Sequence, residues 1–118
     1  MPKDKISDLS FKFALRIIEL YRFLAKNNEY VVSKQLLRSG TSIGANVQEA
    51  SAACSKKDFI LKMTIASKEA RETKYWLSLL HQSQMVKGNY STLIKEIDSI
   101  INILTRIIKT MQANLLKG

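Results

Sequence analysis

Three charged side chains have types and spacing that suit acid–base chemistry. Glu69 and Glu72 lie about one helical turn apart, on a predicted helix face that they share with Trp76. Paired carboxylates can transfer protons or hold a metal ion. Arg38, on an earlier segment, offers a simpler interpretation, because its guanidinium would pair with a carboxylate between helices and fix their register. We favour a buried pair of this kind over a role at a subunit interface, and over catalysis. The Arg38 face continues at intervals of four, three and four residues through Ser42, Ala45 and Glu49.

The sequence lacks the sets of residues that a metal site or nucleophilic catalysis requires. Cys54 is the single cysteine and His81 the single histidine, so no Cys/His set stands at metal-ligand spacing. Neither Glu69 nor Glu72 begins the Glu-x-x-His motif of metal-binding bundles. We expect Cys54 to be a small, semi-buried residue and His81 to lie at the surface or a helix end. The sequence therefore predicts no enzymatic activity, no metal site and no cofactor.

Gly40 and Gly44 stand four residues apart, which invites comparison with a phosphate-binding loop. A P-loop requires a different spacing, a following lysine and a preceding strand, and none of these is present. Two glycines inside a helix cost about 1 kcal/mol each relative to alanine. A heptad-like apolar seam, with intervals of four and three residues, continues without a break past both glycines: Leu36, Gly40, Ile43, Val47, Ala50 and Cys54. We therefore predict a helix in which the glycines are close-packing positions.

Lysine and arginine exceed aspartate and glutamate by 19 to 10, a formal net charge of +9. The excess is greatest over residues 55–87, and basic stripes bind phosphate backbones by releasing counterions. No aromatic residues interleave to read bases, so we expect electrostatic binding of RNA or DNA with little sequence preference. A solvated basic surface is the alternative. The candidates are Lys56, Lys57, Lys68, Arg71 and Lys74, with a second stripe at Lys12, Arg16, Arg22 and Lys26.

Apolar spacing predicts helices over residues 8–26 and 30–53. Ser7 or Asp8 is the expected N-cap of the first helix. The apolar side of that helix, which includes Phe13, Ala14 and Ile18, is wider than one core-facing stripe requires. A helix of this kind usually has contacts on two sides, and we expect the second contact to be another subunit.

Two further helices are predicted over residues 56–84 and 91–116. Ser55 and Asp58 have the form of a capping box, and residues 86–90 form the clearest loop. Small residues occupy the middle of the third helix, as the glycines do in the second, so we expect these two helices to approach closely there. Short connections favour an all-α, antiparallel up-down-up-down four-helix bundle, with residues 1–118 as one domain.

The composition and termini narrow the class of protein. Glycine and proline together number 5 of 118 residues, which argues against turn-rich β-sandwiches and barrels. The first residues lack the apolar core of a signal peptide, and no apolar stretch approaches the roughly 20 residues that span a bilayer. We therefore expect a cytoplasmic protein with no membrane contact.

Residues 33–50 read SKQLLRSGTSIGANVQEA and residues 65–77 read IASKEARETKYWL, after Asp58-Phe59. These blocks resemble the signature of the bacterial 23S rRNA intervening-sequence proteins. Residues 47–50 read Val-Gln-Glu-Ala, where the family more often has Ile-Ala-Glu-Gly. The matching motif residues here are Arg38, Ser39, Gly40, Ser42, Gly44, Asn46, Glu49, Glu69, Glu72, Tyr75 and Trp76.

The resemblance implies an up-down four-helix bundle that assembles as a homopentameric ring around a central channel. It implies no established enzymatic activity. The related accessory variability proteins of diversity-generating retroelements bind nucleic acid and a reverse transcriptase. We therefore expect a non-enzymatic, oligomeric protein that binds nucleic acid. The alternative is a scaffold that recruits a protein such as a reverse transcriptase.

Overall fold

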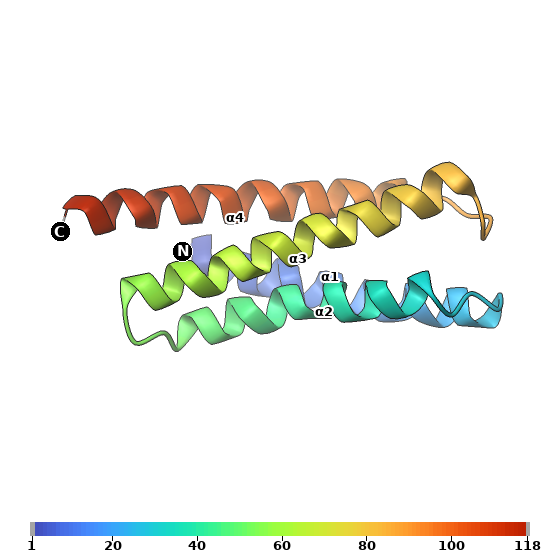
Figure 1. Cartoon of the computed structure of the whole chain (residues 1–118), viewed down its shortest axis with the longest axis horizontal. Coiled ribbons are helices and arrows are strands. Elements are labelled where there is room, and N and C mark those ends of the chain that lie inside the picture. The colour runs from blue at the N-terminus through green and yellow to red at the C-terminus, as the bar shows by residue number, and fades with distance from the viewer. Residues whose placement is uncertain (1, 118) are drawn as a thin grey trace.

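The computed structural model describes the backbone of residues 2–117 and the side chains of residues 5–117. Four helices, α1 (Pro2–Lys26), α2 (Val32–Ser51), α3 (Lys56–Ser83) and α4 (Ser91–Lys117), form an elongated bundle of 52 × 22 × 21 Å (Figure 1). Residues 2–117 contain no strand. No helix among them combines the length and apolar character needed to cross a bilayer.

The helices run alternately up and down the bundle. Each helix packs against the next one along the chain, and α1 closes the arrangement against α4, while α1–α3 and α2–α4 are diagonal pairs. Figure 1 shows the last turns of α4 extending past the loop between α2 and α3. The predicted all-α, four-helix bundle is thus confirmed.

The core draws on apolar residues of all four helices. Burying one large aliphatic or aromatic side chain contributes about 1.5–3 kcal/mol relative to leaving it exposed, so these residues supply the main stabilising term. The largest fully buried side chains include Phe13, Ile17, Leu36, Ile43, Leu77, Leu80, Ile97 and Leu104.

Helix α1 begins six residues earlier than predicted, at Pro2. Ser7 and Asp8 lie within the helix, so their prediction as N-caps is wrong. Ile6 is fully buried and belongs to the core, and its burial stabilises the additional turn. Proline is also well tolerated in a first helical turn, where its missing N–H would have no partner.

Helix α2 begins at Val32 and ends at Ser51, two residues inside each predicted boundary. Glu29 sets its start. The Glu29 carboxylate accepts hydrogen bonds from the backbone N–H groups of Val31, Val32 and Ser33, with N···O distances of 3.1, 3.1 and 2.6 Å. A buried glutamate therefore satisfies amide groups that an N-cap side chain would otherwise bind.

The start of α3 matches the prediction. Ser55 is the N-cap, and its hydroxyl accepts the Asp58 backbone N–H at 3.1 Å. The helix ends at Ser83, before Gln84 in the left-handed region at φ 52°. In the following loop, the Tyr90 hydroxyl donates to the Val86 carbonyl at 2.6 Å, and burial raises the Tyr90 pKa above its ordinary value.

Gly40 and Gly44 lie inside α2, as the apolar seam predicts. Their partner differs from the predicted one. A Cβ on Gly40 would lie 2.8 Å from Ile17 Cγ2, and one on Gly44 would lie 3.4 Å from the Ser10 carbonyl oxygen. Both positions therefore face α1, and not the small residues of α3.

Candidate functional site

Arg38 joins α2 to α3 through both carboxylates of the predicted acidic pair. Its Nη1 lies 3.0 Å from Glu69 Oε2, and its Nη2 donates to Glu72 Oε2. The predicted interhelical ion pair is confirmed. Its predicted burial is wrong, because the Arg38 side chain is 50% exposed. The hydrogen bond to Glu72, followed by the charge of Glu69, raises the Arg38 pKa against the opposing effect of desolvation.

Trp76 completes this arrangement on α3. Its indole Nε1–H donates to Glu72 Oε2 at 3.0 Å. This bond, and then the bond from Arg38, holds the Glu72 pKa below its ordinary value of 4.5. Tyr75 packs edge-on against Trp76, with ring centroids 5.3 Å apart. Glu72 is therefore ionised at neutral pH and already accepts two donors, which suits it to a structural role better than to proton donation.

Other residues of the resembling motif extend the same contact between α2 and α3. Thr73 and Ser39 are both fully buried, and their hydroxyl oxygens are 2.8 Å apart. In the last turn of α2, the Glu49 carboxylate accepts a hydrogen bond from Lys62 Nζ at 3.0 Å and raises the Lys62 pKa. These two contacts and the Arg38 network all lie between α2 and α3.

Ser42 and Asn46 bond within their own helix. The Ser42 hydroxyl donates to the Ser39 carbonyl at 2.9 Å, and the Asn46 amide donates to the Ser42 carbonyl at 2.9 Å. Residues 5–117 contain no group of three His, Cys, Asp or Glu side chains placed to hold a metal ion. Within the motif, Arg38, Ser39, Glu49, Glu69 and Glu72 therefore join α2 to α3, whereas Gly40 and Gly44 pack against α1.

The outer face of α3 carries three of the predicted nucleic-acid-binding residues together. Lys57, Lys68 and Arg71 are exposed and, at 100° per residue, fall within about 60° of one another around the helix. Tyr75 lies in the same sector with 58% of its surface exposed. The expectation that no aromatic interleaves with the basic residues is therefore wrong. Tyr75 follows Arg71 by four residues, and this spacing already places the two side chains on the same face of a helix.

The remaining basic candidates do not form one continuous surface. Within the described side chains, Lys74 pairs with Asp98 at 2.7 Å, Arg16 with Glu96 at 2.7 Å and Lys12 with Asp8 at 3.1 Å. The first two pairs tie α4 to α3 and α1, and the third lies within α1. Arg22 and Lys26 are exposed near the end of α1, away from the α3 group.

Helix α1 also exposes apolar residues on its outer side. Ala14 and Ile18, which contributed to the expected second contact, are half-buried. Phe11 and Leu15 are more open, at 62% and 48% exposure. All four line a shallow groove of about 340 Å³ between α1 and α2, beside Gly44 and Ala45.

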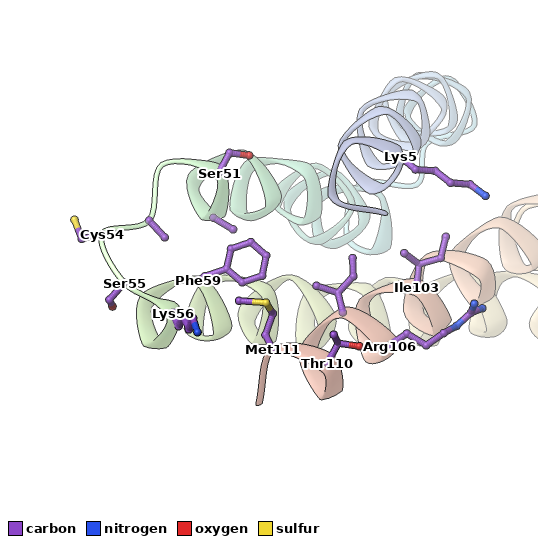
Figure 2. A pocket seen from close by; sticks show the side chains of 13 residues that line it. Lys5, Ser51, Cys54, Ser55, Lys56, Phe59, Ile103, Arg106, Thr110 and Met111 are labelled. Atoms are coloured by element: carbon purple, nitrogen blue, oxygen red, sulfur yellow. The ribbon is translucent and has the colours of Figure 1, made fainter. Parts of the chain in front are cut away.

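A larger groove of about 1060 Å³ opens at the end of the bundle where α2 stops and α3 begins (Figure 2). Lys56 lines it, together with Lys5 and Arg106, which sequence analysis did not select. These three cations stand about 50 residues apart in sequence, so no local pattern signals their proximity. Cys54 also lines the groove and is exposed, which corrects its expected semi-burial. His81 lies in the last turn of α3, as expected.

Comparison with known proteins places this geometry in a family. The family model described as 23S rRNA-intervening sequence protein matches residues 3–106. The chain is also similar to a solved structure from Bacteroides thetaiotaomicron, described as a protein with unknown function from the S23 ribosomal protein family. The two are 47% identical with a TM-score of 0.87, over 92% of this chain and 99% of that one. No curated protein matches the chain. The chain belongs to the 23S rRNA-intervening sequence protein family.

Proposed function

We propose that the outer face of α3 binds nucleic acid, RNA or DNA, through its phosphate backbone. The observation that supports this most strongly is the exposed sector that combines Lys57, Lys68 and Arg71 with Tyr75. Lysine and arginine side chains that neutralise phosphates release the counterions condensed on the nucleic acid, and this release favours binding. An exposed aromatic ring adds stacking with unpaired bases of any sequence. Binding is therefore non-catalytic and has little sequence preference.

The acidic residues near this sector weigh little against phosphate binding. Glu69 and Glu72 are the nearest carboxylates along α3, and Arg38 of α2 pairs with both and offsets one of their two negative charges. A phosphate on the outer face would therefore be attracted by Lys68 and Arg71 and repelled less strongly by the two glutamates. The second predicted stripe, on α1, is a weaker candidate because Lys12 and Arg16 already pair with carboxylates.

Fluorescence anisotropy with a labelled single-stranded RNA of mixed sequence tests this function. We expect the double variant Lys68→Ala/Arg71→Ala to bind at least about tenfold more weakly, and Tyr75→Ala to weaken binding of single strands more than of duplexes. Lys34→Ala/Lys95→Ala removes the same charge from exposed positions elsewhere and serves as the control. An equal loss in both double variants contradicts the proposal. No binding at physiological salt would favour the alternative scaffold that recruits a protein such as a reverse transcriptase.

We further propose that the protein functions as a homo-oligomer, with the apolar groove beside Phe11 and Leu15 covered by a second copy. Exposed aromatic and aliphatic neighbours of this kind are typical of protein–protein contacts, and the small, exposed Ala45 beside them leaves room for another chain. The resemblance stated above implies a ring of five subunits. An oligomer would repeat the α3 cations and raise the attraction for polyanions.

A further inference from the structure

The groove at the end of the bundle has an apolar floor formed by three helices. Phe59 of α3 and Ile103, Ile107 and Met111 of α4 line it, with Ala50 at the end of α2. Figure 2 shows Phe59, Ile103 and Met111 projecting into the space between the α1–α2 pair and the α3–α4 pair. Ile103 and Met111 are eight residues apart, which corresponds to about 12 Å along α4. The floor is therefore long enough for two turns of a docked helix.

The margin of this groove is cationic. Lys5, Lys56 and Arg106 line it, and no aspartate or glutamate does. Among the described side chains, none of the three takes part in an ion pair. Figure 2 shows Lys5 and Arg106 extending from opposite walls of the groove, away from its floor. An occupant must therefore combine an apolar face with negative charge beside it.

These properties distinguish between possible occupants. Each of the four helices of this chain carries more basic than acidic residues, so a helix from a second copy would bring like charge to the margin. The phosphates of a nucleic acid would pair with the cations, but nothing in its backbone would pack against the apolar floor. The groove is open rather than enclosed, whereas ordinary small-molecule pockets bury most of the surface of their ligand. A helix with acidic flanks matches both the floor and the margin.

We propose that this groove binds an acidic amphipathic helix of a partner protein. Apolar side chains of the helix at positions i, i+3 or i+4, and i+7 would pack on Phe59, Ile107 and Met111, in the helix-in-groove mode. Its flanking carboxylates would pair with Lys5, Lys56 and Arg106. The inference does not rest on nucleic-acid binding by α3. Part of the groove also lies beyond the family match, because that match ends at residue 106.

A pair of synthetic peptides tests this site in the full-length protein. The probe is a helix-forming 15-residue peptide with leucines at i, i+3, i+4 and i+7 and glutamates around them. Its counterpart has lysines in place of the glutamates. We expect one acidic peptide to bind per chain, with an affinity that falls as salt rises, and the basic peptide not to bind. Equal affinity of the two peptides would overturn the proposal.

Charge-reversed variants locate the bound peptide. Lys5→Glu/Arg106→Glu should weaken its binding about tenfold or more, and Met111→Glu should do so by placing a carboxylate on the floor. The matched control Lys34→Glu/Lys95→Glu changes the net charge equally at exposed positions elsewhere. A control that weakens binding as much as the groove variant would overturn the proposal. After correction for that control, groove variants should retain RNA affinity, which separates this proposal from the function of α3.

Cys54 supplies a second readout because it is exposed, lines the groove and is the only cysteine. Bound acidic peptide should slow alkylation of the thiol. Unchanged alkylation at saturating peptide would contradict occupation of this groove. Protection by RNA in place of peptide would identify nucleic acid as the occupant, and protection that rises with protein concentration alone would identify a second copy. Either result would overturn the proposal.

Discussion

The hydroxyl oxygens of Ser39 on α2 and Thr73 on α3 lie 2.8 Å apart, and both side chains are fully buried. This contact lies in the interior between α2 and α3, whereas the ion pairs of Arg38 and Lys62 join the same helices nearer the surface. A displacement of one helix along the other would separate the two hydroxyls inside the core, where an unpaired polar group is costly. The buried pair therefore fixes the register of α2 against α3. The half-exposed Arg38 network lies outside this buried contact.

Thr73→Val should lower the free energy of unfolding by about 1–2 kcal/mol, because valine fills the same space but leaves the Ser39 hydroxyl without this partner. Urea unfolding followed by circular dichroism measures the change. The double variant Ser39→Ala/Thr73→Val should recover part of the loss, since neither hydroxyl then remains unpaired. An unchanged midpoint for Thr73→Val would refute the assigned role of this pair.

The two glycines of α2 should respond differently to alanine. At Gly40 the new Cβ would approach Ile17 Cγ2 to 2.8 Å, so Gly40→Ala should destabilise the fold by about 1–3 kcal/mol. At Gly44 the nearest atoms are 3.4 Å away, which is an ordinary contact. Gly44→Ala should therefore be neutral or should gain up to about 1 kcal/mol of helix propensity. Thermal denaturation compares the two variants, and equal destabilisation would contradict this difference.

Stability should fall in acid partly through Glu72. The bonds from Trp76 and Arg38 lower its pKa below 4.5 in the folded protein. Its contribution is therefore fully present above about pH 4.5 and is lost as the pH falls through the folded-state pKa. Glu72→Gln should flatten the dependence of the unfolding free energy on pH between 3 and 6. Glu19→Gln, at an exposed position, is the control, and the same flattening in both would argue against the Trp76–Glu72–Arg38 network.

Self-association should depend on the outer side of α1. Phe11→Glu places a charge at a side chain that is 62% exposed, so it should reduce the assembly state without unfolding the chain. Multi-angle light scattering measures the mass, and circular dichroism checks the helix content. Leu116→Glu introduces the same charge at a leucine that is 90% exposed near the end of α4, and should leave the mass unchanged. A wild-type chain that is monomeric at all concentrations would disprove the proposed oligomer.

The architecture follows from the spacing of apolar residues to a large extent. The apolar spacing over residues 30–53, 56–84 and 91–116 predicts helices that the structure has as α2, α3 and α4, because a period near 3.6 residues places the apolar side chains on the one side of a helix that is buried. The start of α1 is different. Ser7 and Asp8 have the form of a cap, but burial of Ile6 in the core outweighs that local preference and extends the helix.

Features that depend on how the helices pack were less predictable. Arg38, Glu69 and Glu72 were identified because they repeat on helix faces, yet spacing does not determine that Arg38 stays half-exposed. Spacing also does not say which neighbour faces Gly40, since both adjacent helices offer suitable surfaces. The cations of the end groove come from three helices, and only the folded chain brings them together.

The proposed nucleic-acid-binding role of α3 is tested most directly by the salt dependence of RNA binding. The wild type and Lys68→Ala/Arg71→Ala are titrated with single-stranded RNA at several salt concentrations, alongside Lys34→Ala/Lys95→Ala. We predict that loss of Lys68 and Arg71 reduces the slope of log affinity against log salt by about 1.4, or about 0.7 for each lost phosphate contact. The control should retain the wild-type slope. Identical slopes in all three proteins would contradict the account.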